Sequence, residues 1–283
     1  MTDITESLLG RPGARPRRAP LANLGRRLRR RGAAWLAPAF ILALWQACSA
    51  LGWLPANVLP SPTDVLRAFW RLTLSGELAQ NIGVSFLRAA AGFAIGGGVG
   101  FALGLANGLS KLSETLTDST LQMVRNIPHL ALIPLVILWF GIDEGAKLFL
   151  VALGVFFPVY LNTLHGVRTV DPQLIEMGRS YGMTPGALFR RVILPGALPS
   201  IFVGLRFALG VMWLTLIVAE TIAAQSGLGY MAMQAREFMQ TDIVVLAILI
   251  YALLGKAADT SARLLEGRFL QWNPAFQTRG ASA

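Results

Sequence analysis

Long apolar stretches separated by short polar segments dominate the chain. Six of them reach the length of about 20 residues that a helix needs to cross a membrane. They cover approximately residues 34–53, 82–108, 115–141, 146–166, 196–221 and 242–264. Only residues 127–142 of the third are strongly apolar, so we expect a broken helix whose polar first part, residues 115–126, lies near the cytoplasmic surface. The pattern predicts an all-α membrane protein, a polytopic bundle of about six transmembrane helices.

Polar stretches divide the chain into three parts. Residues 1–32 combine proline, glycine and arginine with few large apolar groups, which predicts a solvated cytoplasmic tail. Residues 33–266 form the transmembrane domain, and residues 267–283 form a cytoplasmic C-terminal tail. A secretory signal peptide would also join a basic segment to an apolar one, but its apolar core has only about 7–15 residues. Because residues 35–53 are longer and further crossings follow, we interpret them as a retained first helix.

The segment before the second crossing, residues 54–81, is too polar to span a membrane. Pro60, Ser61 and Pro62 end an extended stretch there, and the residues after them start a short helix that includes Phe69 and Trp70. Tryptophan is enriched at membrane interfaces. We therefore expect this helix to lie at the outer interface.

Composition and charge support the membrane assignment. Of the 283 residues, 54% are hydrophobic and 14% are charged, whereas soluble domains carry roughly a quarter charged residues. The net charge of +10 is not accompanied by a nucleic-acid recognition fold, so we expect no nucleic-acid partner. Nine arginines precede the first crossing, and with the N-terminus inside, eighteen lysines and arginines are cytoplasmic against four outside. This bias follows the positive-inside rule and predicts that both termini are cytoplasmic.

The second crossing carries a glycine at every fourth position. Because residues four apart share one face of a helix, this face is bare backbone that lets another helix approach closely. Packing within the chain is the favoured interpretation, and dimerisation of two copies is the alternative. The glycines are Gly92, Gly96, Gly100, Gly104 and Gly108.

A basic polar segment, residues 171–195, separates the fourth and fifth crossings. Asp171 and Pro172 are typical of a helix start, Gly182 is typical of a helix end, and Thr184 with Pro185 starts a second short helix. We therefore expect a helix–turn–helix on the cytoplasmic face of the membrane.

The spacing within this segment resembles the cytoplasmic coupling loop of ABC-importer permeases. That motif reads Glu-Ala-Ala, three residues, Gly, nine residues, Ile-x-Leu-Pro; here Glu176 precedes Gly182, and nine further residues lead to Val-Ile-Leu-Pro. The resemblance implies that the segment docks in a groove of a separate ATPase subunit. The matching positions are Glu176, Gly182, Leu194 and Pro195, with Arg179 beside them, and the departures from the motif are Met177, Gly178 and Val192.

The resemblance covers nearly everything after residue 33. Pro-Ser-Pro near residue 60 and the stretches 125–142, 194–221 and 226–231 look like the nitrate/sulfonate/taurine branch of these permeases, and most of all like its aliphatic-sulfonate members. This implies a type I importer permease in a bacterial inner membrane that carries a small organic anion. The implied partners are two ATPase subunits, an external substrate-binding protein and a second copy of the chain. Taurine, nitrate or a pyrimidine precursor are alternative substrates on the same scaffold.

The sequence lacks the motifs of an enzyme. It contains no phosphate-binding loop of the form GxxxxGK[ST], no metal-ligand cluster and no nucleophile–base arrangement, so we expect no catalysis, cofactor or metal. The competing function is an ATP-independent secondary transporter. Such a transporter would need carboxylates inside its membrane crossings to bind the ion that drives transport. Acidic residues are few there, and helix rise places Glu220 near the outer end of its crossing.

Candidate pathway residues are sparse polar or aromatic groups within the crossings. Arg206 falls near mid-depth, where it lines the pathway or pairs with Glu220 or a backbone carbonyl; both alternatives stay open. Arg88 lies close to the outer end of its helix, where we expect its side chain to extend toward the interface. The remaining candidates for the pathway wall are Asn126, His129, Trp139, Trp213 and Thr215.

Overall fold

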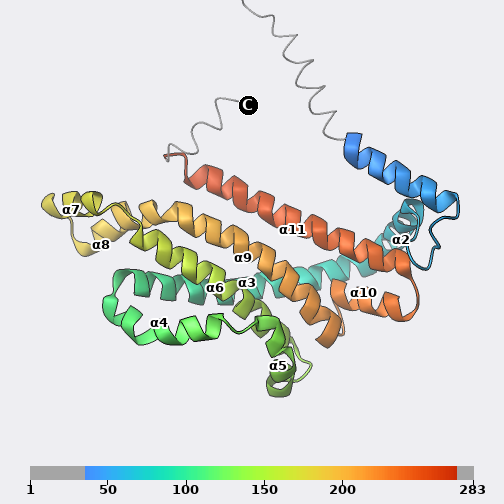
Figure 1. Cartoon of the computed structure of the whole chain (residues 1–283), viewed down its shortest axis with the longest axis horizontal. Coiled ribbons are helices and arrows are strands. Elements are labelled where there is room, and N and C mark those ends of the chain that lie inside the picture. The colour runs from blue at the N-terminus through green and yellow to red at the C-terminus, as the bar shows by residue number, and fades with distance from the viewer. Residues whose placement is uncertain (1–35, 273–283) are drawn as a thin grey trace, which may run out of the picture. The chain divides into compact units, whose positions relative to one another are not determined.

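A computed structural model describes residues 36–272, and every regular element in that range is a helix (Figure 1). The chain divides into two compact units, Met1–Leu54 and Pro55–Ala283. The described part of the first unit holds the apolar helix Leu36–Ala50, which is shorter than a membrane crossing. The basic tail, residues 1–32, and residues 273–283 lie outside the described residues. The first crossing and both tails therefore stay predictions.

Four helices of the second unit are long and apolar enough to cross a membrane. Three are α3 (Glu77–Leu109), α6 (Glu144–Arg168) and α11 (Thr241–Phe269). The fourth, Pro185–Ile222, joins α8 (Pro185–Leu188) through the π-helical turn η2 (Phe189–Ile193) to α9 (Leu194–Ala223). These helices confirm the second, fourth, fifth and sixth predicted crossings.

The third predicted crossing is broken, as expected. Helix α4 (Lys111–Arg125) meets η1 (His129–Leu132) and α5 (Ile133–Phe140) at a bend of 81°. Pro128 lies in the break, where it lacks a backbone N–H and disfavours helical geometry in the residue before it.

The position of the polar first part relative to the membrane surface stays a prediction. At its start, Glu114 forms an ion pair with Arg168 at the end of α6, whereas at its end Arg125 lines one pocket with Gly154. Those two α6 positions are fourteen residues, about 21 Å, apart, so α4 extends from the end of α6 toward its middle, although none of its residues is buried. The start of α4 is attached to α3, because the Asn107 side chain of α3 binds the hydroxyls of Ser113 and Thr117.

The glycine face of α3 packs against α6. A Cβ on Gly100 would lie 2.6 Å from the Phe156 carbonyl oxygen, and one on Gly108 would lie 2.7 Å from Val167 Cγ1. Any larger side chain would collide with the neighbouring helix. The glycine ladder therefore serves packing within the chain, which confirms the favoured interpretation.

Two shorter helices pack at the end of the bundle opposite the segment 171–195. Helix α2 (Pro62–Leu74) contacts α3 and α11, and α10 (Leu228–Glu237) contacts α3, α9 and α11. Ser61 caps α2 by accepting a hydrogen bond from the Asp64 amide, and its hydroxyl donates to the Asp64 carboxylate, which lowers the pKa of that carboxyl. The predicted helix after Pro60 is confirmed.

Candidate functional site

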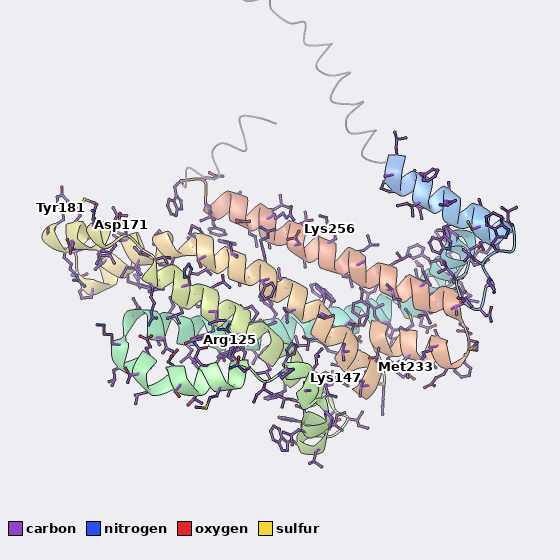
Figure 2. All side chains as sticks on the ribbon, viewed as in Figure 1. Arg125, Lys147, Asp171, Tyr181, Met233 and Lys256 are labelled. Carbon is purple, nitrogen blue, oxygen red and sulfur yellow. The ribbon has the colours of Figure 1, made fainter. Side chains whose placement is uncertain are left out.

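The segment 171–195 projects beyond the ends of the long helices (Figures 1 and 2). Helix α7 (Pro172–Ser180) begins where the Asp171 carboxylate accepts a hydrogen bond from the Gln173 amide at 2.8 Å. The chain turns away from the helix axis at Gly182, two residues after the last helical residue. The φ of Gly182, +73°, is in the left-handed region that favours glycine. The amides of Gly182 and Met183 close the turn by donating to carbonyls of the last helical turn, a Schellman arrangement. Both predicted helix boundaries are confirmed.

Helix α7 folds back onto α8 through a close contact. Gly178 is buried, and a Cβ at that position would lie 2.7 Å from Leu188 Cδ1. Thr184 caps α8 by accepting from the Ala187 amide. Because α8 continues through η2 into α9, the segment is rigidly joined to a membrane-length helix.

The motif residues of this segment occupy two different environments. Glu176, Arg179 and Gly182 are exposed, and neither charged side chain forms an ion pair among the described residues. Leu194 and Pro195 are half-buried at the start of α9, where Leu194 packs against a buried cluster that includes Val167 and Val170. The first group forms a free surface, and the second attaches that surface to the bundle.

Exposed apolar side chains lie beside these charges on α7. Met177 is 51% exposed and Tyr181 is 78% exposed, and Figure 2 shows Tyr181 at the tip of the segment. An apolar surface of this kind with charges at its border is typical of a protein-binding site.

Two of the candidate pathway residues meet in the structure. The Nε2 atom of His129 lies 3.0 Å from the Thr215 hydroxyl, and Thr215 is fully buried. A Cβ on Gly154 of α6 would lie 2.8 Å from that hydroxyl and 3.4 Å from the imidazole nitrogen. His129 and Gly154 also line a pocket of about 250 Å³ between the broken crossing, α6 and α9.

The other candidates lie elsewhere. Asn126 is exposed, and its amide donates to the Gln122 carbonyl. Trp139 is 61% exposed on α5, whereas Trp213 is buried against the Tyr251 ring. The six candidates therefore do not form one site within a single chain.

Arg206 pairs with acidic residues of α11. Its guanidinium lies 3.2 Å from Asp259 and 3.4 Å from Glu266, and it has no contact with Glu220 among the described residues. The proposed pairing with Glu220 is therefore wrong, because Glu220 lies about 21 Å further along α9.

A mostly buried ionic cluster is the main feature that the sequence analysis missed. It is formed by Ser85, Arg88, Lys147, Glu220 and Tyr251, which are buried, and by Glu144, which is exposed. Only 4% of the Arg88 side chain is exposed, and it binds Glu220 at 2.8 Å and Glu144 at 2.6 Å. The expected extension of Arg88 to the interface is wrong, because the start of α6 and the end of α9 bring carboxylates to it. Lys147 also pairs with Glu144, so the four charges balance.

Glu220 is the centre of this buried cluster. It accepts hydrogen bonds from the Ser85 hydroxyl, the Gly229 amide and the Tyr251 hydroxyl, each between 2.7 and 2.9 Å. Gly227 has a φ of +106°, and a Cβ there would lie 2.6 Å from Arg88 Nη1. The glycines at 227 and 229, seven and nine residues after an acidic residue near a helix end, were the available sequence signal.

Comparison with known proteins gives a consistent result. Residues 96–271 match the family model described as binding-protein-dependent transport system inner membrane component. A protein of Escherichia coli (strain K12), named a putative aliphatic sulfonates transport permease protein, is 62% identical over 252 residues, covering 89% of this chain and 96% of that protein. A protein of the same name from Bacillus subtilis (strain 168) is 47% identical, covering 86% and 88% of the two chains.

A solved structure shares the fold. The crystal structure of an amino acid ABC transporter with histidines aligns with a TM-score of 0.56 and 21% identity, over 72% of this chain and 96% of that one. The match supports the predicted all-helical permease fold.

Proposed function

The chain belongs to the family of inner membrane components of binding-protein-dependent transport systems, and from its similarity to two named relatives we propose that it carries aliphatic sulfonates. As a permease subunit of an ABC importer it lies in the inner membrane, and a separate subunit hydrolyses ATP. This family membership replaces the ATP-independent secondary transporter considered from the sequence. We propose the specific substrate, the number of subunits in the assembly and the side of the membrane on which the termini lie.

The identity to the two relatives carries the substrate assignment. Both are named as aliphatic-sulfonate permeases, and at 62% and 47% identity each is aligned over most of its length. The test is uptake of labelled ethanesulfonate, taurine and nitrate by a strain that lacks this gene, with and without a plasmid copy. We expect the plasmid to restore ethanesulfonate uptake most strongly. Restored uptake of only taurine or only nitrate would contradict the assignment.

The free surface of α7 supports a coupling role. Glu176, Arg179 and the adjacent apolar side chains are exposed with no partner in the described chain, and Gly182 fixes their orientation. We assign this surface to the ATPase subunit. Leu194 and Pro195 then transmit motion, because they join the surface to α9.

The assembly contains two copies of the chain, two ATPase subunits and an external binding protein. The chain supplies one coupling segment, and its candidate pathway residues do not enclose a channel by themselves, so a second copy is needed. Native mass measurement of the purified complex tests this. A transport-competent complex with one permease copy would contradict it.

Both termini lie on the cytoplasmic side. The coupling segment precedes α9, and α11 runs back toward the same side because α9 and α11 are joined by the short helix α10. A phosphatase fused after residue 283 should be inactive, since it needs the oxidising external compartment, while the same fusion after Met239 should be active.

A further inference from the structure

The pocket beside His129 lies next to the middle part of α6. It is bounded by the break between α4 and η1, by Gly154 on α6 and by Val211 on α9. Gly154 follows the first residue of α6 by ten positions, or about 15 Å of helix. Gly154 is therefore distant from both ends of α6, a helix of 25 residues that is long enough to cross a hydrocarbon core of about 30 Å.

The chemistry of the pocket is amphipathic. Most of its lining is aliphatic or aromatic, including Leu153 and Phe157, and its ionisable side chains among the described residues are Arg125 and His129. The Thr215 hydroxyl holds the His129 ring in place. An apolar wall with cationic and hydrogen-bonding groups at one end suits an anion attached to a short hydrocarbon chain.

Arg125 differs from the other cations of this region. Arg88 and Lys147 pair with Glu144, and Arg206 pairs with Asp259 and Glu266. Arg125, in contrast, is exposed at the bend of the broken crossing and forms no ion pair within residues 36–272. A charge inside a membrane protein normally faces a partner or an aqueous pathway. Arg125 is therefore free to bind an anionic group that the chain itself does not provide.

We propose that this pocket binds the transported alkanesulfonate during its passage, with Arg125 on the sulfonate and the apolar wall around the alkyl chain. The inference rests on the proposed substrate. The planar guanidinium donates two parallel hydrogen bonds to neighbouring oxygens of one anion. Gly154 lets α6 pack closely against the His129–Thr215 pair, which forms one side of the pocket, since a Cβ there would crowd both side chains.

Direct binding tests the proposal. The permease, purified with its ATPase subunits but without the binding protein, is titrated with radiolabelled ethanesulfonate, and sulfate is added as a competitor. Arg125→Gln should raise the Kd by about tenfold or more, because a charge-assisted contact is lost. Arg125→Lys, which keeps the charge, should have an intermediate effect. Lys256→Gln is the matched control, because Lys256 is an exposed cation of α11 outside the pocket, and its Kd should equal that of the wild type.

The outcomes separate this inference from the proposed function. Equal affinities for the Arg125→Gln and Lys256→Gln complexes would overturn the pocket while leaving sulfonate uptake intact. Competition by sulfate as strong as by unlabelled ethanesulfonate would overturn the role of the apolar wall. A wild-type complex that binds no ethanesulfonate, in cells that import it, would also overturn the site. Absence of ethanesulfonate uptake in those cells would instead contradict the substrate assignment.

Discussion

Gly182 sets the direction in which α7 leaves the bundle. Its left-handed backbone permits the two hydrogen bonds that reverse the chain after α7, and nothing lies within 4 Å of the position a Cβ would take. The constraint at this residue is therefore conformational and not one of space. The sequence was sufficient to predict it, because a glycine after a short capped helix has few other uses.

Gly182→Ala should lower transport without loss of membrane insertion. The left-handed conformation costs an alanine about 1 kcal/mol relative to glycine, which favours other orientations of α7. Uptake and ATPase copurification should both fall. Gly186→Ala is the control, because Gly186 also has open space around it but ordinary helical geometry. Equal uptake by the two variants would remove Gly182 from the coupling mechanism.

Glu176 should be needed for docking and not for folding. It is exposed and unpaired within the described chain, so Glu176→Ala should leave the amount of permease in the membrane unchanged. We expect weaker copurification of the ATPase and slower uptake. Gln173→Ala, an exposed change on the same helix but outside the coupling motif, should be close to wild type. Wild-type ATPase association in the Glu176→Ala complex would contradict the assigned role.

Among the elements, the long apolar helices were easier to predict than the contacts between helices. Hydropathy identified α3, α6, α9 and α11, because bilayer thickness fixes their length. It did not identify how α4 packs, because the hydroxyls of Ser113 and Thr117 bind Asn107 of another helix. The ionic cluster around Glu220 was missed for the same reason. Its members come from α3, α6, α9 and α11, and pairing between distant segments leaves no local pattern that identifies the partners.

The glycine face of α3 gives a prediction for helix packing. Gly96→Val should reduce the amount of folded permease, because the backbone of Ala152 on α6 occupies the space where the side chain would go. Gly98→Val, on the same helix, should be tolerated, since nothing lies within 4 Å of its Cβ position. Thermal unfolding in detergent, followed by tryptophan fluorescence, distinguishes the two. Equal melting temperatures would contradict the packing described for α3 and α6.

The ionic cluster should hold the outer ends of four helices together. Glu220→Ala leaves the buried Arg88 with one carboxylate partner fewer, and breaking a buried pair costs about 3 kcal/mol or more. Glu237→Ala, an exposed change at the end of α10, should have little effect. The midpoint of thermal unfolding should fall for the first variant only. An unchanged midpoint for Glu220→Ala would show that the cluster adds no stability.

At the scale of the whole molecule, the two ends have separate tasks. The ionic cluster fixes the outer end, the α7 surface is free for an ATPase at the other end, and the pocket at Arg125 lies between them. The family and its fold followed from motif spacing in the sequence. The position of the pocket did not, because it depends on the bend after α4 and on the approach of α6 and α9.

Reconstitution tests the account most directly. Proteoliposomes containing the permease and its ATPase subunits, with binding protein and labelled ethanesulfonate outside and ATP inside, should accumulate the label while hydrolysing ATP. The Glu176→Ala permease, incorporated in equal amount, should lose accumulation and substrate-stimulated hydrolysis together. Accumulation without ATP, or full ATP-driven accumulation by the Glu176→Ala permease, would contradict a sulfonate importer driven through the α7 surface.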